Sequence, residues 1–153
     1  MGKIMSVEIK NILSAVRYAT ISTVDEQGKA WAAPVWYVFD EKNTLYWWSP
    51  INSQHSQNIE RSGEVYITIF NSTAPEGEGL GLYIRANAKQ VPNDKLDKII
   101  ELYNSTTTQF KLNRANTTSN APTRLYQAEL ITIQINDGTE TDGFYQDIRR
   151  NVA

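Results

Sequence analysis

The sequence predicts a mainly β fold, a six-stranded antiparallel barrel accompanied by a few helices. Runs rich in β-branched and aromatic residues alternate with short polar turns, for example at residues 25–29 and 40–43. Only two of the connections between predicted strands contain a helical pattern. Hairpin-length connections of this kind favour an antiparallel barrel over a doubly wound parallel sheet.

The chain begins with an amphipathic helix over residues 6–17, for which Ser6 provides the N-terminal cap. The apolar residues at helical spacing are Ile9, Ile12, Leu13 and Val16. A β-favouring run over residues 18–24 follows and ends at a polar turn that contains Gly28. We therefore expect the first helix to lie on a barrel that starts with the second element.

The second strand, residues 30–39, is apolar on both of its faces. We expect it to be buried on both sides or to line a cavity. Pro34 lacks the N–H group that a ladder hydrogen bond needs, so its position predicts a bulge or a sheet edge.

The other expected elements follow the same rules. In order they are a strand over residues 44–49, a helix between Ser53 and Gly63, strands over 64–70 and 80–91, a helix capped by Asn93, and a strand over 124–136. Residues 104–122 are polar and predict a long loop with a short helical turn, anchored by Phe110 and Leu112. The tail, residues 137–153, predicts turns and ends in a basic pair, Arg149 and Arg150.

Length and composition predict a single domain over residues 1–153, since 41% hydrophobic and 21% charged residues are ordinary for a soluble globular protein. A net charge of −2 provides no positive field, so we expect neither nucleic acid nor membrane as a partner. The absence of cysteine excludes disulfides and cysteine-ligated metals. No signal-peptide pattern and no run of ~20 apolar residues occurs, which predicts a cytoplasmic protein.

The stretch from Tyr46 to Gly63 is the most informative for function. Ser53 is a good N-cap residue, and the first turn of the helix after it offers unpaired N–H groups beside the single histidine, His55. A helix start of this kind favours anions. Trp47 and Trp48 lie immediately upstream and point to opposite faces of a strand, so at most one of them can face a ligand. An anion site beside an aromatic surface predicts a flat, phosphorylated ligand.

The polar residues of this helix have alternative interpretations. His55 is either a phosphate ligand or a polar residue on a solvated helix, and its position after a capping serine favours the first. A metal site is not expected, because the chain has neither a second histidine nor a cysteine. Asn58 could serve either the backbone of the preceding loop or the ligand. No catalytic residue is predicted, since the carboxylate pairs fall in turns and one histidine makes no triad.

The order of the elements from Val7 to Ile135 resembles that of the pyridoxamine 5'-phosphate oxidase-like family, which are FMN-binding split β-barrels. The resemblance is sharpest in residues 30–39, 46–49, 53–60, 65–72 and 75–88. It implies a homodimer with FMN at the subunit interface, and places Trp36 and Trp48 near the flavin. The strand around Val35 would run along the isoalloxazine ring, and the helix start would meet the phosphate. The cofactor-binding residues predicted in this way are Ala33, Pro34, Val35, Trp36, Trp48, Ser49, Ser53, Gln54, His55 and Asn58.

The sequence departs from the family pattern at two places. Oxidases of the family usually have an Arg-Lys pair where this chain has Gln54 and His55, so the phosphate would be held by backbone amides and Ser53. The tail offers Arg149 and Arg150 but no histidine, so pyridoxamine phosphate is not the expected substrate. The leading hypothesis is an FMN-dependent oxidoreductase acting on an unknown small substrate. The alternatives are a non-catalytic module that binds flavin, deazaflavin F420 or haem for sensing or storage, and a protein that acts only through its dimer surface.

Overall fold

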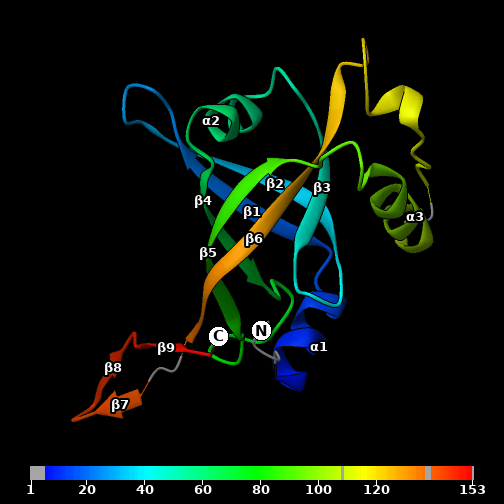
Figure 1. The fold of residues 1–153 in the computed structure, drawn as a ribbon. Helices are drawn as coiled ribbons and strands as arrows, with labels where there is room; N and C mark the ends of the chain where they lie inside the picture. The colour runs from blue at the N-terminus through cyan, green and yellow to red at the C-terminus, as the bar shows by residue number, and fades with distance from the viewer. Residues whose placement is uncertain (1–5, 108, 137–138, 153) are drawn as a thin grey trace.

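The computed structural model describes residues 6–107, 109–136 and 139–152, and its centre is a closed barrel of six antiparallel strands (Figure 1). The barrel strands are β1 (Tyr18–Val24), β2 (Ala30–Phe39), β3 (Leu45–Pro50), β4 (Glu64–Phe70), β5 (Gly81–Gln90) and β6 (Thr123–Asn136). Their order in the sheet is β3-β2-β1-β4-β5-β6, and β3 also pairs with β6, which closes the barrel. The predicted fold class is confirmed, and three of the predicted strands have the predicted bounds.

The tail differs from its prediction. It forms three short strands, β7 (Thr139–Thr141), β8 (Phe144–Gln146) and β9 (Arg149–Asn151), where the sequence predicted only turns. β9 pairs with the free edge of β6, and β7 pairs with β8. A strand of three residues is too short to show the alternation of polar and apolar side chains that identifies a strand in a sequence. Its conformation depends instead on hydrogen bonds to the neighbouring strand.

The barrel is joined unevenly around its circumference. β5 and β6 pair over nine positions, from Leu82↔Ile135 to Gln90↔Tyr126, whereas β1 pairs with β4 over three positions and β2 with β3 over three. β1 and β2 pair with each other over seven positions. The β1–β2 hairpin is therefore joined to the other four barrel strands by two short seams.

The first part of β2 lies beyond the short seam with β3. Residues 30–36 pair with β1 but have no partner strand on the other side. Pro34 lies in this stretch, which confirms the edge predicted for it. Of the two alternatives predicted for this strand, burial on both faces holds for its second half and not for its first half, where Trp31 is 49% exposed. That the first half lines a ligand cavity stays a prediction.

Two apolar clusters stabilise the fold. The inner cluster fills the barrel and includes Trp47, which is fully buried and stacks on Tyr126 with ring centroids 6.0 Å apart. The outer cluster lies between the β2–β3–β6 wall and helix α3 (Leu96–Thr106), and includes Val38 and Leu125. Burial of apolar surface on both sides of this wall explains why β2 and β3 read as continuous apolar runs.

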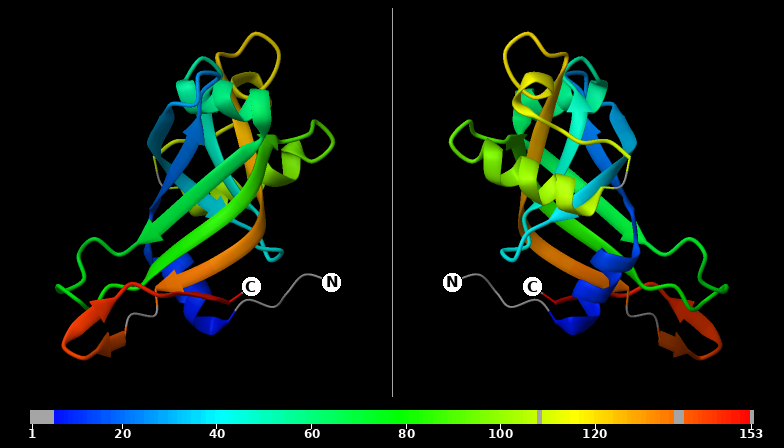
Figure 2. Two further views of the ribbon diagram at one scale, coloured as in Figure 1. Left: turned by 90° about the vertical axis from the view of Figure 1, so that its left-hand side faces the viewer. Right: turned by 90° about the vertical axis from the view of Figure 1, so that its right-hand side faces the viewer.

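Two helices lie at opposite ends of the barrel and α3 lies at its side (Figure 2). The predicted cap of α1 (Val7–Ala15) is confirmed, because the Ser6 side chain accepts a hydrogen bond from the Ile9 N–H. The Tyr37 hydroxyl donates to the Leu13 carbonyl over 2.9 Å, which fixes this helix to the barrel. The other end is covered by α2 (Gln54–Ser62). Among the described residues, no helix is long and apolar enough to cross a membrane.

Two predictions around α3 were wrong. The N-cap of α3 is Lys95, which makes no side-chain cap bond, and Asn93 lies in the preceding turn. Phe110 is 64% exposed and anchors nothing, whereas Leu112 is buried as predicted. The side-chain amide of Asn104 fixes Leu112 by accepting a hydrogen bond from the Leu112 N–H and donating one to the Leu112 carbonyl. The hydrophobicity of the segment does not reveal such a contact. The predicted helical turn is confirmed as a short 3₁₀ helix, Arg114–Asn116.

Candidate functional site

The candidate site begins where β2 and β3 separate. The last pair between these strands is Tyr37↔Trp47, after which β3 continues along β6 alone. Residues 30–36 of β2 and 48–50 of β3 therefore each have one unpaired edge, and we call the gap between them the fork. Unpaired strand edges carry free backbone donors and acceptors, which a ligand can use.

Helix α2 bridges the two sides of the fork. Ser53 caps it by accepting a hydrogen bond from the Ser56 N–H at 3.3 Å, and Gly63 ends it with a positive φ of 73°. The sequence predicted both of these ends, and both are confirmed. On the β3 side, His55 Nε2 lies 3.0 Å from Ser49 Oγ. On the hairpin side, a second contact is made by Asn58.

Asn58 is 3% exposed and connects α2 to β1. Its Nδ2 donates to Thr23 Oγ1 over 2.9 Å, and its Oδ1 accepts from Gln54 Nε2 over 2.8 Å. Neither of these bonds goes to the backbone of the preceding loop, so that alternative for Asn58 is wrong, while its role toward a ligand stays a prediction. Thr23 was missed, since nothing in the sequence shows that residues 35 positions apart meet.

His55 lies inside the site, where burial favours its neutral form. The side chain is 8% exposed, and its Nε2 lies 3.3 Å from Ser53 Oγ as well as near Ser49. Burial lowers its pKa below the ordinary value of 6.5. The helix start therefore offers an anion neutral donors only: the N–H groups of Gln54 and His55, which precede the first intrahelical bonds.

The two tryptophans expected near a ligand come from the two sides of the fork, Trp36 from β2 and Trp48 from β3, and both lie on the outer face of the sheet. Trp36 contacts Tyr103 of α3 edge to face, with centroids 5.1 Å apart, and Trp48 packs on the same outer cluster. Trp47 points into the barrel, so the prediction of opposite faces is confirmed. The indole N–H of Trp48 is buried and has no partner among the described residues. The indole N–H of Trp47, inside the barrel, is buried without a partner in the same way.

The remaining predicted residues of β2 differ in what they can offer a ligand. Pro34 is exposed, Ala33 is half-buried, and Val35 is buried in the inner cluster. Val35 can therefore contribute only its backbone edge, while Pro34 presents an apolar surface. The predicted residues thus lie around the fork and α2, but some of them can offer a ligand only their backbone and not their side chain.

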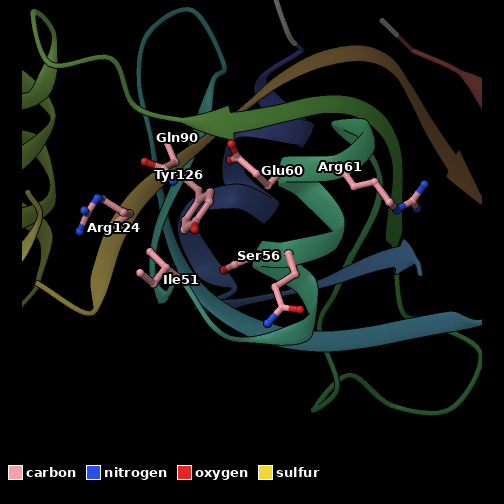
Figure 3. Close-up of a pocket in the computed structure, with 8 residues that line it drawn as sticks. Ile51, Ser56, Glu60, Arg61, Gln90, Arg124 and Tyr126 are labelled. Atoms are coloured by element: carbon pink, nitrogen blue, oxygen red, sulfur yellow. The ribbon is translucent and has the colours of Figure 1, made fainter. Parts of the chain in front are cut away.

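A pocket of about 410 Å³ lies between α2 and the strands β5 and β6 of the barrel (Figure 3). Ser56 and Glu60 of the helix face Tyr126 and Gln90 of the barrel across it, while Arg61 points away. Arg124 also lines this pocket and pairs with Ser49 in the β3–β6 register. Its guanidinium donates to the carbonyls of Ser119 and Ala121 in the preceding loop and of Thr123 at the start of β6. The Arg124 side chain therefore holds the loop in place. The position of Arg124 beside Ser49 was not predicted, because the register between strands cannot be read from the sequence.

A metal site is not formed by the described part of the chain. No three histidine, cysteine, aspartate or glutamate side chains lie close enough there to hold an ion. The site is therefore built from hydroxyls, amides and aromatic rings.

The burial of His55 predicts a pH dependence of stability. Because the fold favours the neutral imidazole, the unfolded chain takes up a proton near pH 6.5 before the folded chain does. Stability should therefore fall as the pH drops below 6.5 and stop falling, for this group, below the lowered pKa. The measurement is the melting temperature between about pH 8 and about pH 5, compared with His55→Gln. Equal slopes for the two proteins would contradict the assignment.

Comparison with known proteins identifies a family. The family model for pyridoxamine 5'-phosphate oxidase matches residues 5–137, which is most of the chain. A search of curated proteins found no match.

Solved structures share the fold at low sequence identity. A haem-binding protein from Mycobacterium smegmatis superposes with a TM-score of 0.70 and 12% identity, over 94% of this chain and 56% of that one. HutZ, a haem storage protein from Vibrio cholerae, superposes with a TM-score of 0.69 and 16% identity, over 84% of this chain and 92% of that one. A protein from Listeria innocua, named as a candidate pyridoxamine 5'-phosphate oxidase, superposes with a TM-score of 0.64 and 17% identity, over 84% of this chain and 94% of that one. The chain thus spans little more than half the length of the first of these proteins.

Proposed function

Because this chain belongs to the pyridoxamine 5'-phosphate oxidase family, we propose that it binds FMN at the fork and acts as a flavin-dependent oxidoreductase. The observation that carries the proposal is the fork itself, with its two unpaired strand edges. When bound, FMN supplies the hydride or electron chemistry, and the chain supplies binding, orientation and exclusion of water.

Each side of the site has a separate task in this proposal. The edge of residues 33–36 and Trp48 hold the ring, and Pro34 covers it with apolar surface. Ser53 and the first N–H groups of α2 hold the phosphate, and burial favours the neutral form of the neighbouring His55. As the resemblance implies, the functional unit is a homodimer with its flavin sites at the interface.

The substrate is proposed to be a small molecule other than pyridoxamine phosphate. Arg149, the residue of the tail that could bind a substrate phosphate, is already engaged on the barrel. Its Nη1 donates to the Tyr66 hydroxyl over 3.0 Å, and its guanidinium lies 3.8 Å above the Tyr83 ring. Using it for a substrate would require breaking both contacts.

The direct test of the proposal is binding of FMN and of riboflavin, which lacks the phosphate. At about 100 times its dissociation constant, FMN should stabilise the protein by roughly 2.7 kcal/mol, measured by thermal unfolding. Because neutral donors meet the phosphate, riboflavin should bind more weakly than FMN by only about 2 kcal/mol, which is roughly thirtyfold. A protein whose melting temperature ignores saturating FMN would refute the proposal. A protein that binds FMN but does not pass electrons from NADH or NADPH through it to an added acceptor would be a binding module.

The phosphate end has its own test in Ser53→Ala. Loss of the cap and of a hydroxyl donor should weaken FMN binding by about 1–2 kcal/mol while riboflavin binding changes less. The matched control is Ser6→Ala, which removes the equivalent cap of α1 at the other end of the barrel. Unchanged FMN affinity in Ser53→Ala would place the phosphate elsewhere.

Haem binding is the second candidate. It is favoured by two solved structures of the same fold, which are named as a haem-binding and a haem storage protein. The single histidine would have to leave Ser49 to reach iron, so we expect haem to bind more weakly than FMN. Titration with haemin, followed by its Soret absorbance and by displacement of FMN, decides between the two ligands.

A further inference from the structure

Two opposite charges line the pocket between α2 and the strands β5 and β6 (Figure 3). Glu60 comes from α2 and Arg124 from β6, and neither forms an ion pair within the described part of the chain. Burial raises the pKa of the Tyr126 hydroxyl, its hydrogen bond with Ser56 lowers it, and the smaller effects of Glu60 and Arg124 act in opposite directions. Both charges are therefore close to this hydroxyl, yet they are not paired with each other.

The acidic side of the pocket has free acceptors. The Glu60 carboxylate and the Gln90 amide face each other across the pocket (Figure 3), and neither side chain forms a hydrogen bond with any residue that the structure describes. Arg61, the next residue of the helix, points away and donates to the Val24 carbonyl. A carboxylate beside an amide oxygen suits an ammonium group, because each oxygen can accept one of its three hydrogens.

The basic side of the pocket is held rigidly and has free donors. Nη1 and Nη2 of Arg124 donate to three carbonyls of residues 119–123. Because a guanidinium has five N–H donors, Nε–H and one hydrogen of Nη2 remain without a partner among the described residues. The same pair of nitrogens in Arg114 holds the Asp97 carboxylate, with Nε at 2.7 Å and Nη2 at 3.2 Å. Arg124 can therefore hold a carboxylate of a ligand in this way.

The rest of the pocket offers apolar contact. Ile51 is 41% exposed and lines the pocket together with Ser56 and Tyr126. The volume of about 410 Å³ lies in the range of small-molecule sites in proteins. A ligand with an apolar side chain therefore gains from covering Ile51 as well as from its charges.

We propose that this pocket binds a small zwitterion, an α-amino acid with an apolar side chain. Its ammonium group meets Glu60 and Gln90, its carboxylate meets Arg124, and its side chain covers Ile51. A simple amine would leave Arg124 unpaired, and a simple acid would leave Glu60 unpaired, so the site favours a molecule that carries both charges. The pocket shares no residue with the fork, and the proposal does not depend on flavin binding.

Titration of the isotope-labelled full chain with L-leucine, followed by amide chemical shifts, tests the site. The backbone amides of Ser56, Glu60, Gln90 and Tyr126 should shift together and give a dissociation constant of about 1 mM or lower. Two probes of similar shape each lack one charge, since isoamylamine has no carboxylate and isocaproate has no amine. Each should bind at least about tenfold more weakly than L-leucine, because it leaves one charge of the pocket unpaired.

The variant Glu60→Gln removes the negative charge and keeps the shape of the side chain. It should weaken L-leucine binding by about tenfold and leave isocaproate binding no weaker, because isocaproate has no group for the carboxylate. Glu101→Gln is the matched control, since it changes another exposed glutamate of a helix, in α3, and should alter neither affinity. Both variants should keep the wild-type circular dichroism spectrum.

Four results would overturn the proposal. They are unchanged amide shifts at about 20 mM L-leucine, equal binding of L-leucine and the two probes, equal affinities of Glu60→Gln and wild type, and shifts confined to another part of the surface. Competition between FMN and L-leucine would also overturn it, because the pocket would then belong to the flavin site. A protein that binds L-leucine in this pocket but ignores FMN would contradict the flavin proposal alone.

Discussion

Replacing Trp47 with alanine is expected to lower the free energy of unfolding by about 3–5 kcal/mol. Trp47 is fully buried, stacks on Tyr126, and lies at the last position where β2 and β3 still pair. Its removal leaves a cavity at the base of the fork, which the paired strands cannot close. Urea denaturation at neutral pH measures the change.

Two controls separate the effect of burial from other properties of tryptophan. Trp31→Ala removes the same side chain from an exposed position and should cost well under 1 kcal/mol. Trp47→Phe should cost no more than about 1.5 kcal/mol, because the smaller ring also removes an indole N–H that is buried without a partner. A loss in Trp31→Ala as large as that in Trp47→Ala would contradict the assigned core.

The second large effect is expected for Asn58→Ala. This change leaves the buried hydroxyl of Thr23 without its partner and opens a small cavity, which together should cost about 2–4 kcal/mol. FMN affinity should also fall, because α2 loses its contact with the β1–β2 hairpin. Urea denaturation and FMN titration give the two readouts. The control is Gln57→Ala in the same helix, whose exposed side chain bonds only the Asn52 carbonyl and should cost less than about 0.5 kcal/mol.

A double variant tests whether the amide–hydroxyl contact is the cause. Replacing both partners with apolar groups, as in Asn58→Leu with Thr23→Val, removes the unsatisfied hydroxyl and should restore most of the stability lost in Asn58→Ala. If the double variant is instead less stable than either single one, the loss comes from packing and the interpretation is wrong.

The fold was readable from sequence because its main signals are local. Ser6, Ser53 and Gly63 mark helix ends by the conformation that each residue type favours, and the structure has these ends where they were predicted. The lengths of the polar turns gave the antiparallel order. The errors fall where order comes from a distant partner, as for Leu112 held by Asn104 and for β9 on the edge of β6.

The site was predicted less completely for the same reason. The residues around the fork were found through resemblance, but their geometry depends on contacts between segments far apart in sequence. Asn58 meets Thr23, and Arg124 lies across from Ser49, and neither contact has a sequence signal. The pKa of His55 is lowered by burial, and the sequence alone does not show how deeply this residue is buried. Whether the predicted residues hold FMN remains a prediction, with the titrations above as its measurement.

The two short seams of the barrel have a consequence for its local unfolding. The β1–β2 hairpin is tied internally by seven residue pairs but to β3 and β4 by only three pairs each. The sheet β3-β6-β5-β4 stays paired when the hairpin lifts away, so the hairpin can open as one cooperative unit without global unfolding. Amide hydrogens of the hairpin would then exchange with solvent before those of β5 and β6. A molecule held in the fork would bridge the hairpin and β3, and its binding would appear as slower exchange along the whole hairpin.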